Sequence, residues 1–345
     1  MEKIRVLIVD DSFFMRKVIK DILQTDASVE VVGEAADGHE ALEQIATLKP
    51  RVVTLDIEMP RMDGLQALQA IVRQPHHPSV VIVSGYAKEG AAVTLQCLAI
   101  GAADFVLKPS GALSPDMKKV GDRLLQKVNL AAAIDTAKAH TNHPRSPKPR
   151  QYNTDGGVVV IGASTGGPAA LETLLPEFPA EFPYPIVVAQ HLPRVFAKSF
   201  TDRLRQHCSL PVVLAEQNTK LATGIYIAPG GSTTTINTKR DQPTLEVEED
   251  SHDLETPSVS KLMASAAATY RDKTIGVILT GMGKDGLTGM EKIKESGGTT
   301  IVQDKSTSAV YGMGQAVVQK GLADAILPLP RIMEMINKVV GAEDE

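Results

Sequence analysis

Short apolar runs alternate with amphipathic stretches through the first third of the chain. Strands are predicted where β-branched and other apolar residues follow one another, and helices where apolar residues recur every three to four positions. Repeated strand-helix units of this length are typical of a parallel, doubly wound α/β sheet. The predicted strands are 4–9, 29–33, 52–55, 79–83 and 103–107, and the predicted helices are 13–24, 38–48, 64–73, 90–100 and 114–129.

The pattern breaks at residues 138–150, where the sequence reads KAHTNHPRSPKPR. This segment has four Lys or Arg residues, three prolines, no acidic residue and no apolar period. Such a composition is typical of an extended, solvated linker. A basic docking tail is the alternative. We therefore expect a first domain over residues 1–125, a linker over 126–153 and a second domain over 154–345.

The alternation of strands and helices resumes at residue 157. Residues 232–249 alternate in polarity around a turn at 240–243, which predicts a β-hairpin. The second domain is therefore expected to be a doubly wound, mostly parallel α/β domain with one hairpin. Its predicted strands are 157–161, 185–189, 211–215, 224–228, 274–279, 299–303 and 324–327, and its predicted helices are 168–175, 195–206, 257–270, 285–296 and 330–340.

Composition and charge narrow the class of protein. The chain has 345 residues, of which 43% are hydrophobic and 22% charged, as expected for two globular domains. A net charge of −5 gives no sign of a nucleic-acid partner. The start of the chain lacks a cleavable signal pattern, and no apolar run is long enough to span a membrane. We expect a cytoplasmic protein without membrane insertion, in which Cys97 and Cys208 are reduced.

Polar residues follow successive predicted strands of the first domain. Asp10 and Asp11 follow the first strand, and Asp56 follows the third. Ligands of a doubly wound sheet collect at the carboxyl ends of its strands. Carboxylates that meet there repel one another unless a cation joins them, and oxygen ligands suit Mg²⁺. The alternative is that these acids are helix N-caps or solvated loop residues.

Two further residues extend this group. Ser84 follows the fourth strand and Lys108 follows the fifth. A hydroxyl, an ammonium and a hard metal at one edge could hold a phosphoryl group. One carboxylate could then accept it as an acyl phosphate.

Four stretches of the first domain resemble a response-regulator receiver domain, matched over its whole length: VLIVDDSFFMR, VVTLDIEMPRMDG, SVVIVSGY and ADFVLKPSG. The resemblance implies a flavodoxin-like (βα)5 fold and a histidine kinase as phosphodonor. It implies Asp56 as phosphoacceptor, in a Mg²⁺ site completed by Asp10, Asp11 and the backbone carbonyl of Glu58. It also implies that Ser84 is the switch hydroxyl, that Lys108 contacts the phosphate and that Phe105 is the aromatic switch residue. For Phe105 the alternative is an ordinary core position in a strand.

The second domain presents a serine in a turn of small residues. Residues 158–168 read VVVIGASTGGP, which places Ser164 between a strand and a helix. Glycines in this turn let a substrate approach the backbone. Ser164 is therefore a candidate nucleophile, and a nucleophilic hydroxyl needs a base and an acid that orients the base.

A candidate base and acid follow other predicted strands. His191 directly follows PIVVAQ, and the stretch IGVILTGMGKDG (275–286) supplies Asp285 after an apolar strand and a glycine-rich loop. Backbone N–H groups around Met282 and Gly283 could face a developing oxyanion. The alternatives are a structural role for His191 and a helix N-cap role for Asp285.

Four stretches of the second domain resemble the catalytic domain of the CheB-type protein-glutamate methylesterases of bacterial chemotaxis: VIGASTGGP, QHLP, LTGMGKDG and QDKSTSAVYGM. The resemblance implies Ser164 as nucleophile, His191 as base and Asp285 as orienting acid. It places Thr165 and Met282 at the active site. The implied substrates are glutamate γ-methyl esters, and specific glutamines, on methyl-accepting chemoreceptors, and the hydrolysis needs no cofactor.

The two resemblances together imply a phosphorylation-activated hydrolase. In this hypothesis the unphosphorylated receiver covers the edge that carries Ser164. An oxidoreductase is one alternative, because VVVIGASTGG is similar to a dinucleotide-binding turn, although the G-x-G-x-x-G spacing is missing. A second alternative is a phosphorylation switch without enzyme activity, whose second domain only binds a partner.

Overall fold

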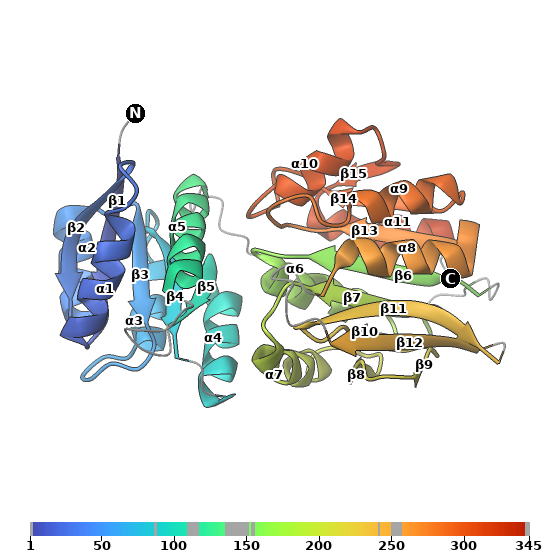
Figure 1. The fold of residues 1–345 in the computed structure, drawn as a ribbon, viewed down its shortest axis with the longest axis horizontal. Helices are drawn as coiled ribbons and strands as arrows, with labels where there is room; N and C mark the ends of the chain where they lie inside the picture. Colours follow the sequence, from blue (N-terminus) through green and yellow to red (C-terminus); the bar gives the residue numbers. More distant parts are fainter. Residues whose placement is uncertain are drawn as a thin grey trace. The chain divides into compact units, whose positions relative to one another are not determined.

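The structure is a computed structural model that describes residues 3–85, 88–108, 117–134, 152, 156–240, 242–249 and 257–341. The chain divides into two compact units, residues 1–140 and 141–345. Each unit is built around a parallel sheet covered by helices (Figure 1). The expected linker segment 138–150 lies outside the described residues.

The first unit has the five predicted strands in the order β2-β1-β3-β4-β5, all paired in parallel. Most residues of β1, β3, β4 and β5 are buried, which is typical of the apolar runs of parallel strands, whereas the edge strand β2 is mostly half-buried. Helices α1 and α5 pack together through a core that they share with the strands. The strands are β1 (Ile4–Val9), β2 (Val29–Ala35), β3 (Val52–Asp56), β4 (Ser79–Ser84) and β5 (Asp104–Leu107). The helices are α1 (Phe13–Leu23), α2 (Gly38–Leu48), α3 (Gly64–Val72), α4 (Lys88–Ile100) and α5 (Met117–Ala133).

Helix α5 continues past the domain boundary expected at residue 125 and past the helix end expected at 129. Its buried residues Leu124, Val128 and Ala131 recur at helical spacing, and Val128 is fully buried against the sheet core. The buried apolar face of the helix therefore extends to Ala131, and the helix ends at Ala133. The regular structure of the first unit therefore reaches into the expected linker of residues 126–153, up to Ala133.

The second unit has a seven-stranded parallel sheet in the order β15-β14-β13-β6-β7-β10-β8 and a three-stranded sheet in the order β11-β12-β9. Its strands are β6 (Val158–Ala163), β7 (Pro185–Gln190), β8 (Val212–Leu214), β9 (Thr219–Lys220), β10 (Gly224–Ile227), β11 (Ser232–Lys239), β12 (Gln242–Glu249), β13 (Thr274–Ile278), β14 (Thr299–Gln303) and β15 (Ala325–Leu327). Its α-helices are α6 (Gly167–Leu174), α7 (Arg194–Arg205), α8 (Val259–Tyr270), α9 (Leu287–Glu295), α10 (Gly312–Gln319) and α11 (Leu329–Val340).

The predicted hairpin is present as β11 and β12, and the pairing of Lys239 with Gln242 makes its turn tighter than the four residues expected. One strand and one α-helix of the described residues were not predicted. Strand β9 is too short to show a period, and it pairs with β12 through Thr219 and Lys220. Helix α10 begins at Gly312 and contains Gly314, and such glycines weaken a helical pattern.

The strand order places a topological switch at the centre of the seven-stranded sheet. The chain enters at β6, moves to β7 on one side, and later returns to β13 on the other side of β6. The carboxyl ends of β13, β6 and β7 are therefore neighbours at one edge, where the ligands of such sheets collect.

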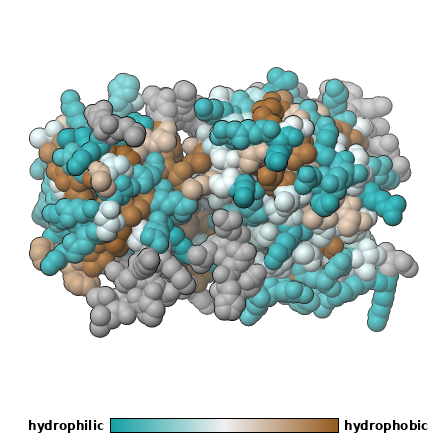
Figure 2. Space-filling model, turned by 45° about the horizontal axis from the view of Figure 1, so that its top comes forward, coloured by the Kyte–Doolittle hydropathy of each residue, from teal (hydrophilic) through white to brown (hydrophobic). Residues whose placement is uncertain are grey.

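Hydrophilic residues cover much of the face shown in Figure 2, with smaller hydrophobic areas between them. Two large apolar side chains, Phe13 and Phe14 at the start of α1, are 72% and 53% exposed. Among the residues that the structure describes, no helix combines the length and the apolar character needed to cross a membrane.

Candidate active site

Ser164 is the first residue after β6, in the predicted strand-to-helix turn. Its N–H donates to the carbonyl of Thr280 at 3.0 Å, and its own carbonyl accepts the N–H of Gly167 at 2.8 Å. Gly166 has φ +76°, and a Cβ there would lie 2.6 Å from the Cβ of Ala309. The turn therefore requires glycine on both conformational and steric grounds.

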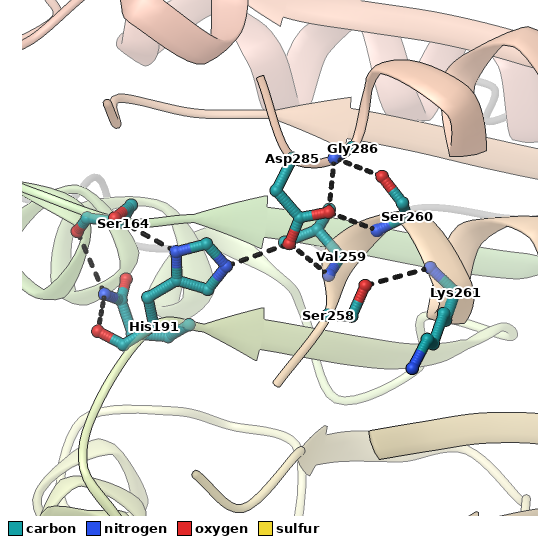
Figure 3. Close-up of polar contacts among 9 residues, drawn as sticks. Ser164, His191, Ser258, Val259, Ser260, Lys261, Asp285 and Gly286 are labelled. Atoms are coloured by element: carbon teal, nitrogen blue, oxygen red, sulfur yellow. Dashed lines mark hydrogen bonds and ion pairs between the residues drawn. The ribbon is translucent and has the colours of Figure 1, made fainter. Parts of the chain in front are cut away.

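His191 is the first residue after β7 and lies beside Ser164. Its N–H donates to the carbonyl of Ala163 at 3.0 Å, which fixes its backbone against β6. Its ring nitrogen Nδ1 lies 3.2 Å from the Oγ of Ser164, and its Nε2 lies 2.9 Å from the Oδ2 of Asp285 (Figure 3). The structure thus brings together the three residues singled out from the sequence.

Asp285 is held by backbone amides as well as by His191. Its Oδ2 accepts the N–H of Val259 at 2.8 Å, and its Oδ1 accepts the N–H groups of Ser260 at 2.9 Å and Gly286 at 2.8 Å (Figure 3). Val259 and Ser260 are the first residues of α8. The carboxylate therefore binds the N-terminus of α8, and Gly286 is the N-cap of the helix that follows it, α9.

Burial acts to raise the pKa of Asp285, but hydrogen bonds from His191, Ser260 and Val259 outweigh it and lower this pKa to about 2. The carboxyl group is therefore ionised at neutral pH and can only accept hydrogen bonds. The Nε2 of His191 must then carry a proton. In the neutral imidazole this leaves a lone pair on Nδ1, directed at the hydroxyl of Ser164.

Gln190 is a buried residue of this site that the sequence did not single out. Its side chain is at the end of β7, and the residue is 2% exposed. Its Nε2 donates to the carbonyls of Ser164 at 2.9 Å and His191 at 3.1 Å. A polar residue at the end of an otherwise apolar strand, directly before His191, was the signal that could have indicated it.

Thr165 and the loop that carries Met282 lie next to Ser164. Thr165 directly follows Ser164, and its carbonyl accepts the hydroxyl of Thr280 at 2.9 Å. Met282 follows Gly281, where a Cβ would lie 2.8 Å from the Cβ of Ser164. The glycine lets the 281–283 loop pass directly beside Ser164.

The carboxylates of the first unit also converge. Oxygen atoms of Asp10, Asp11 and Asp56 lie within 4.8 Å of one another. The Nζ of Lys108 lies 2.8 Å from Oδ2 of both Asp10 and Asp56. These side chains border a pocket, which is lined by Asp11, Asp56, Ile57, Glu58, Ser84, Gly85, Gly90 and Lys108. One ammonium does not balance three carboxylates, so this set of oxygen atoms suits a hard divalent cation such as Mg²⁺.

Burial raises the pKa of Asp56 to about 6, although the hydrogen bond and positive charge of Lys108 act against it. Asp10 adds to the increase through its negative charge. Burial acts to lower the pKa of Lys108, but its bonds to Asp10 and Asp56 outweigh this and raise it. The two groups therefore stabilise each other in their charged forms inside a largely buried pocket.

Ser84 and Phe105 occupy different surroundings. Ser84 is at the end of β4, is 1% exposed, and its Oγ accepts the hydroxyl of Thr94 at 3.0 Å. Phe105 is 4% exposed in β5, and the Nζ of Lys127 lies 4.9 Å from its ring centroid. Phe105 is not among the residues that line the pocket, whereas Ser84 is.

The fold and the two sites define a two-unit α/β protein with an acidic pocket in one unit and a Ser-His-Asp arrangement in the other. The family model for the CheB methylesterase matches residues 159–336, and the model for the response regulator receiver domain matches residues 6–114. The chain belongs to the CheB methylesterase family and carries a receiver domain. The family resemblance expected from the sequence is confirmed.

Relatives match along nearly the whole chain. A protein-glutamate methylesterase/protein-glutamine glutaminase of Thermotoga maritima is 41% identical and aligned over 98% of each chain. One of Geobacillus kaustophilus is 42% identical over 99% of this chain and 100% of its own. The crystal structure of the Thermotoga maritima CheB methylesterase catalytic domain covers 54% of this chain and 100% of its own, with 41% identity and a TM-score of 0.52.

The raised pKa of Asp56 predicts a pH-dependent gain in stability on Asp56→Asn. The pKa of this carboxyl group is usually 3.8 and is about 6 in the folded protein. Its contribution to the stability of the fold is therefore fully present below pH 3.8 and is lost as the pH rises through 6. Asparagine does not titrate. At pH 8 without divalent cations, the variant should raise the free energy of unfolding by roughly 1–3 kcal/mol, with the gain disappearing toward pH 4. Urea unfolding of the full chain, monitored by amide exchange in β1 and β3, measures this difference in the free energy of unfolding.

Asp26→Asn is the matched control. Hydrogen bonds from Ser28 and Asn129 lower the pKa of Asp26, so this variant should lose stability above pH 4 rather than gain it. A change on Asp56→Asn that is the same at pH 4 and pH 8 would contradict the buried-carboxylate explanation.

Proposed function

We propose that this chain hydrolyses glutamate γ-methyl esters on protein substrates, with Ser164 as nucleophile, His191 as base and Asp285 as orienting acid. The observation that carries the proposal is the continuous contact from the Ser164 Oγ to the His191 Nδ1 and from the His191 Nε2 to Asp285. The names of the full-length relatives support the same activity.

The geometry supports a two-step hydrolysis. The Ser164 Oγ attacks the ester carbonyl carbon while His191 Nδ1 takes the hydroxyl proton, which gives a tetrahedral intermediate. The imidazolium returns the proton to the departing methoxide, and methanol leaves an acyl-enzyme. Water, deprotonated by the same nitrogen, then attacks the acyl carbon. The imidazolium returns this proton to the departing Ser164 oxygen, and the released glutamic acid loses its own proton to solvent to give the carboxylate. The ionised Asp285 stabilises the imidazolium in both steps.

The turn and the loop beside Ser164 are proposed to bind the reacting carbonyl. Thr165 follows the nucleophile, and Met282 lies in the glycine-rich loop that passes next to it. Backbone N–H groups at such positions stabilise the negative oxygen of a tetrahedral intermediate. A glutamine side chain would pass through an intermediate of the same shape, with ammonia as leaving group, so we propose deamidation of specific glutamines at the same site.

We propose that the first unit controls this hydrolysis through phosphorylation of Asp56. A chemotaxis histidine kinase is the proposed phosphodonor, and methyl-accepting chemoreceptors are the proposed substrates. Asp10, Asp11, Asp56 and the backbone carbonyl of Glu58 would hold Mg²⁺, which supplies positive charge opposite the phosphoryl oxygens. Lys108 and Ser84 line the same pocket and would contact the added group. A phosphoryl group adds nearly two negative charges, enough to rearrange the hydrogen bonds of Ser84.

Phe105 is proposed to respond to phosphorylation as an aromatic switch residue. It lies in β5, next to the strand that ends at Ser84, and Ile82 of that strand is its register partner. In the described structure its ring is buried and faces Lys127. A change in the contacts of Ser84 would therefore reach Phe105 through one pair of adjacent strands.

Replacing Ser164 by alanine should abolish hydrolysis because the acyl-enzyme cannot form. Methanol release from methyl-labelled receptor membranes is expected to fall by at least roughly 10³-fold. Ser296→Ala is the matched control, since its hydroxyl donates to the Ile293 carbonyl at the end of α9. Unchanged methanol release by Ser164→Ala would exclude Ser164 as the nucleophile.

Activation should depend on Asp56 and on a divalent cation. With acetyl phosphate and Mg²⁺, methanol release by the wild type is expected to rise by roughly 5–150-fold, the usual range of coupling between two sites. Asp56→Asn should show no such increase, and neither should the wild type in excess EDTA. Equal stimulation of Asp56→Asn and wild type would refute control through this carboxylate.

A further inference from the structure

Thr280 is a buried residue between β13 and the loop beside Ser164, and each of its polar groups is hydrogen-bonded. The residue is 2% exposed. Its carbonyl accepts the Ser164 N–H at 3.0 Å, and its N–H donates to Gln303 Oε1 at 2.8 Å. Its hydroxyl donates to the Thr165 carbonyl at 2.9 Å and accepts the Val310 N–H at 2.9 Å, with the Val310 carbonyl at 3.2 Å.

These bonds fix the backbone on both sides of the Ser164 side chain. The carbonyl of Thr280 holds the N–H that precedes the Ser164 Cα, and its hydroxyl holds the carbonyl of the next residue, Thr165. Contact with the turn is close, because a Cβ at Gly166 would lie 3.2 Å from the Thr280 Oγ1. The direction of the Ser164 Cα–Cβ bond follows from the backbone held in this way.

We propose that Thr280 is a positioning residue whose hydroxyl holds the Ser164–Thr165 turn so that the Ser164 Oγ stays directed at His191. This inference rests on the proposed hydrolysis. The distance from Oγ to His191 Nδ1 is 3.2 Å, so a small rotation of the turn would break the contact. A displacement of a reacting group by about 1 Å can lower the rate by about 10²-fold.

The hydroxyl is not the sole support of the neighbouring loops. The Gly281 N–H donates to the Val310 carbonyl at 2.9 Å, and the Met313 N–H donates to the Gly281 carbonyl at 2.9 Å. These two bonds keep the 281–283 and 310–313 segments together without the side chain of Thr280. Loss of the hydroxyl is therefore expected to act mainly on the turn after Ser164.

The test compares Thr280→Val, which keeps the side-chain shape without the hydroxyl, with Thr280→Ser, which keeps the hydroxyl. For methanol release in the full chain, Thr280→Val should lower kcat by roughly 10–100-fold with KM changed less than about twofold. Thr280→Ser should stay within about threefold of wild type in kcat. Thr201→Val is the matched control, because Thr201 is equally buried and its hydroxyl donates to the Ala197 carbonyl within α7.

A second measurement tests the reactivity of the Ser164 hydroxyl without the proposed substrate. Diisopropyl fluorophosphate modifies an activated serine, and mass spectrometry of the Ser164 peptide gives the rate. Thr280→Val should slow this labelling by a factor similar to its loss in kcat, while Thr201→Val should label at the wild-type rate. Circular dichroism and urea unfolding check the fold, and Thr280→Ala serves as the hydroxyl-free variant if Thr280→Val does not fold.

The outcomes separate the two proposals. If the wild type releases no methanol but labels at Ser164, and the hydroxyl-free variant labels slowly, the positioning role stands and the proposed substrate is wrong. Wild-type kcat and labelling rate in the hydroxyl-free variant would overturn the positioning role. It would be overturned equally if Thr280→Ser and Thr201→Val lost as much activity as Thr280→Val, since the loss would then follow stability.

Discussion

The carboxylate of Asp285 is the interaction on which the candidate active site depends. It accepts hydrogen bonds from the imidazole of His191, from the first two N–H groups of α8 and from the N–H of Gly286. One ionised group therefore ties together a side chain after β7, the start of a helix and the loop after β13. The same bonds keep this carboxylate ionised. It can then only accept a hydrogen bond from His191, so the proton of the neutral imidazole lies on Nε2.

The two units show how surroundings give the same residue type opposite properties. Asp56 is the last residue of β3 and Asp285 lies in the loop after β13, and both side chains are largely buried. Burial dominates at Asp56 and raises its pKa to about 6, whereas donated hydrogen bonds dominate at Asp285 and lower its pKa to about 2. A carboxyl group with a raised pKa, such as Asp56, is suited to a pocket that gains a cation. A carboxylate with a lowered pKa, such as Asp285, is suited to stabilise an imidazolium.

Much of both sheets and of both sites could be predicted from the sequence. Buried parallel strands are uninterrupted apolar runs, and polar residues directly after such runs had to meet at one sheet edge. This logic located Asp10, Asp56, Ser164 and His191, which the structure brings together in two clusters. Asp285 was found by the same logic although nearly a hundred residues separate it from His191.

Other features depend on tertiary contacts that leave no local pattern. Asp285 suggested a cap for the helix that follows it, but its carboxylate binds the N-terminus of α8, which no spacing rule connects to it. The orientation of the His191 ring and the bonds of Gln190 and Thr280 likewise arise from groups distant in sequence. Helix α10 was not predicted because its glycines weaken the helical pattern. One of them, Gly312, is needed where the helix packs closely against the 281–283 loop.

The most direct test of this arrangement is the tautomer of His191, read from the ¹⁵N chemical shifts of its ring nitrogens in histidine-labelled protein and assigned with a His191→Gln variant. For the neutral ring, we predict a protonated Nε2 and an unprotonated Nδ1, with this preference lost in Asp285→Asn. A proton on Nδ1 in the neutral ring, unaffected by Asp285→Asn, would contradict it, since Nδ1 could then not take the proton of Ser164.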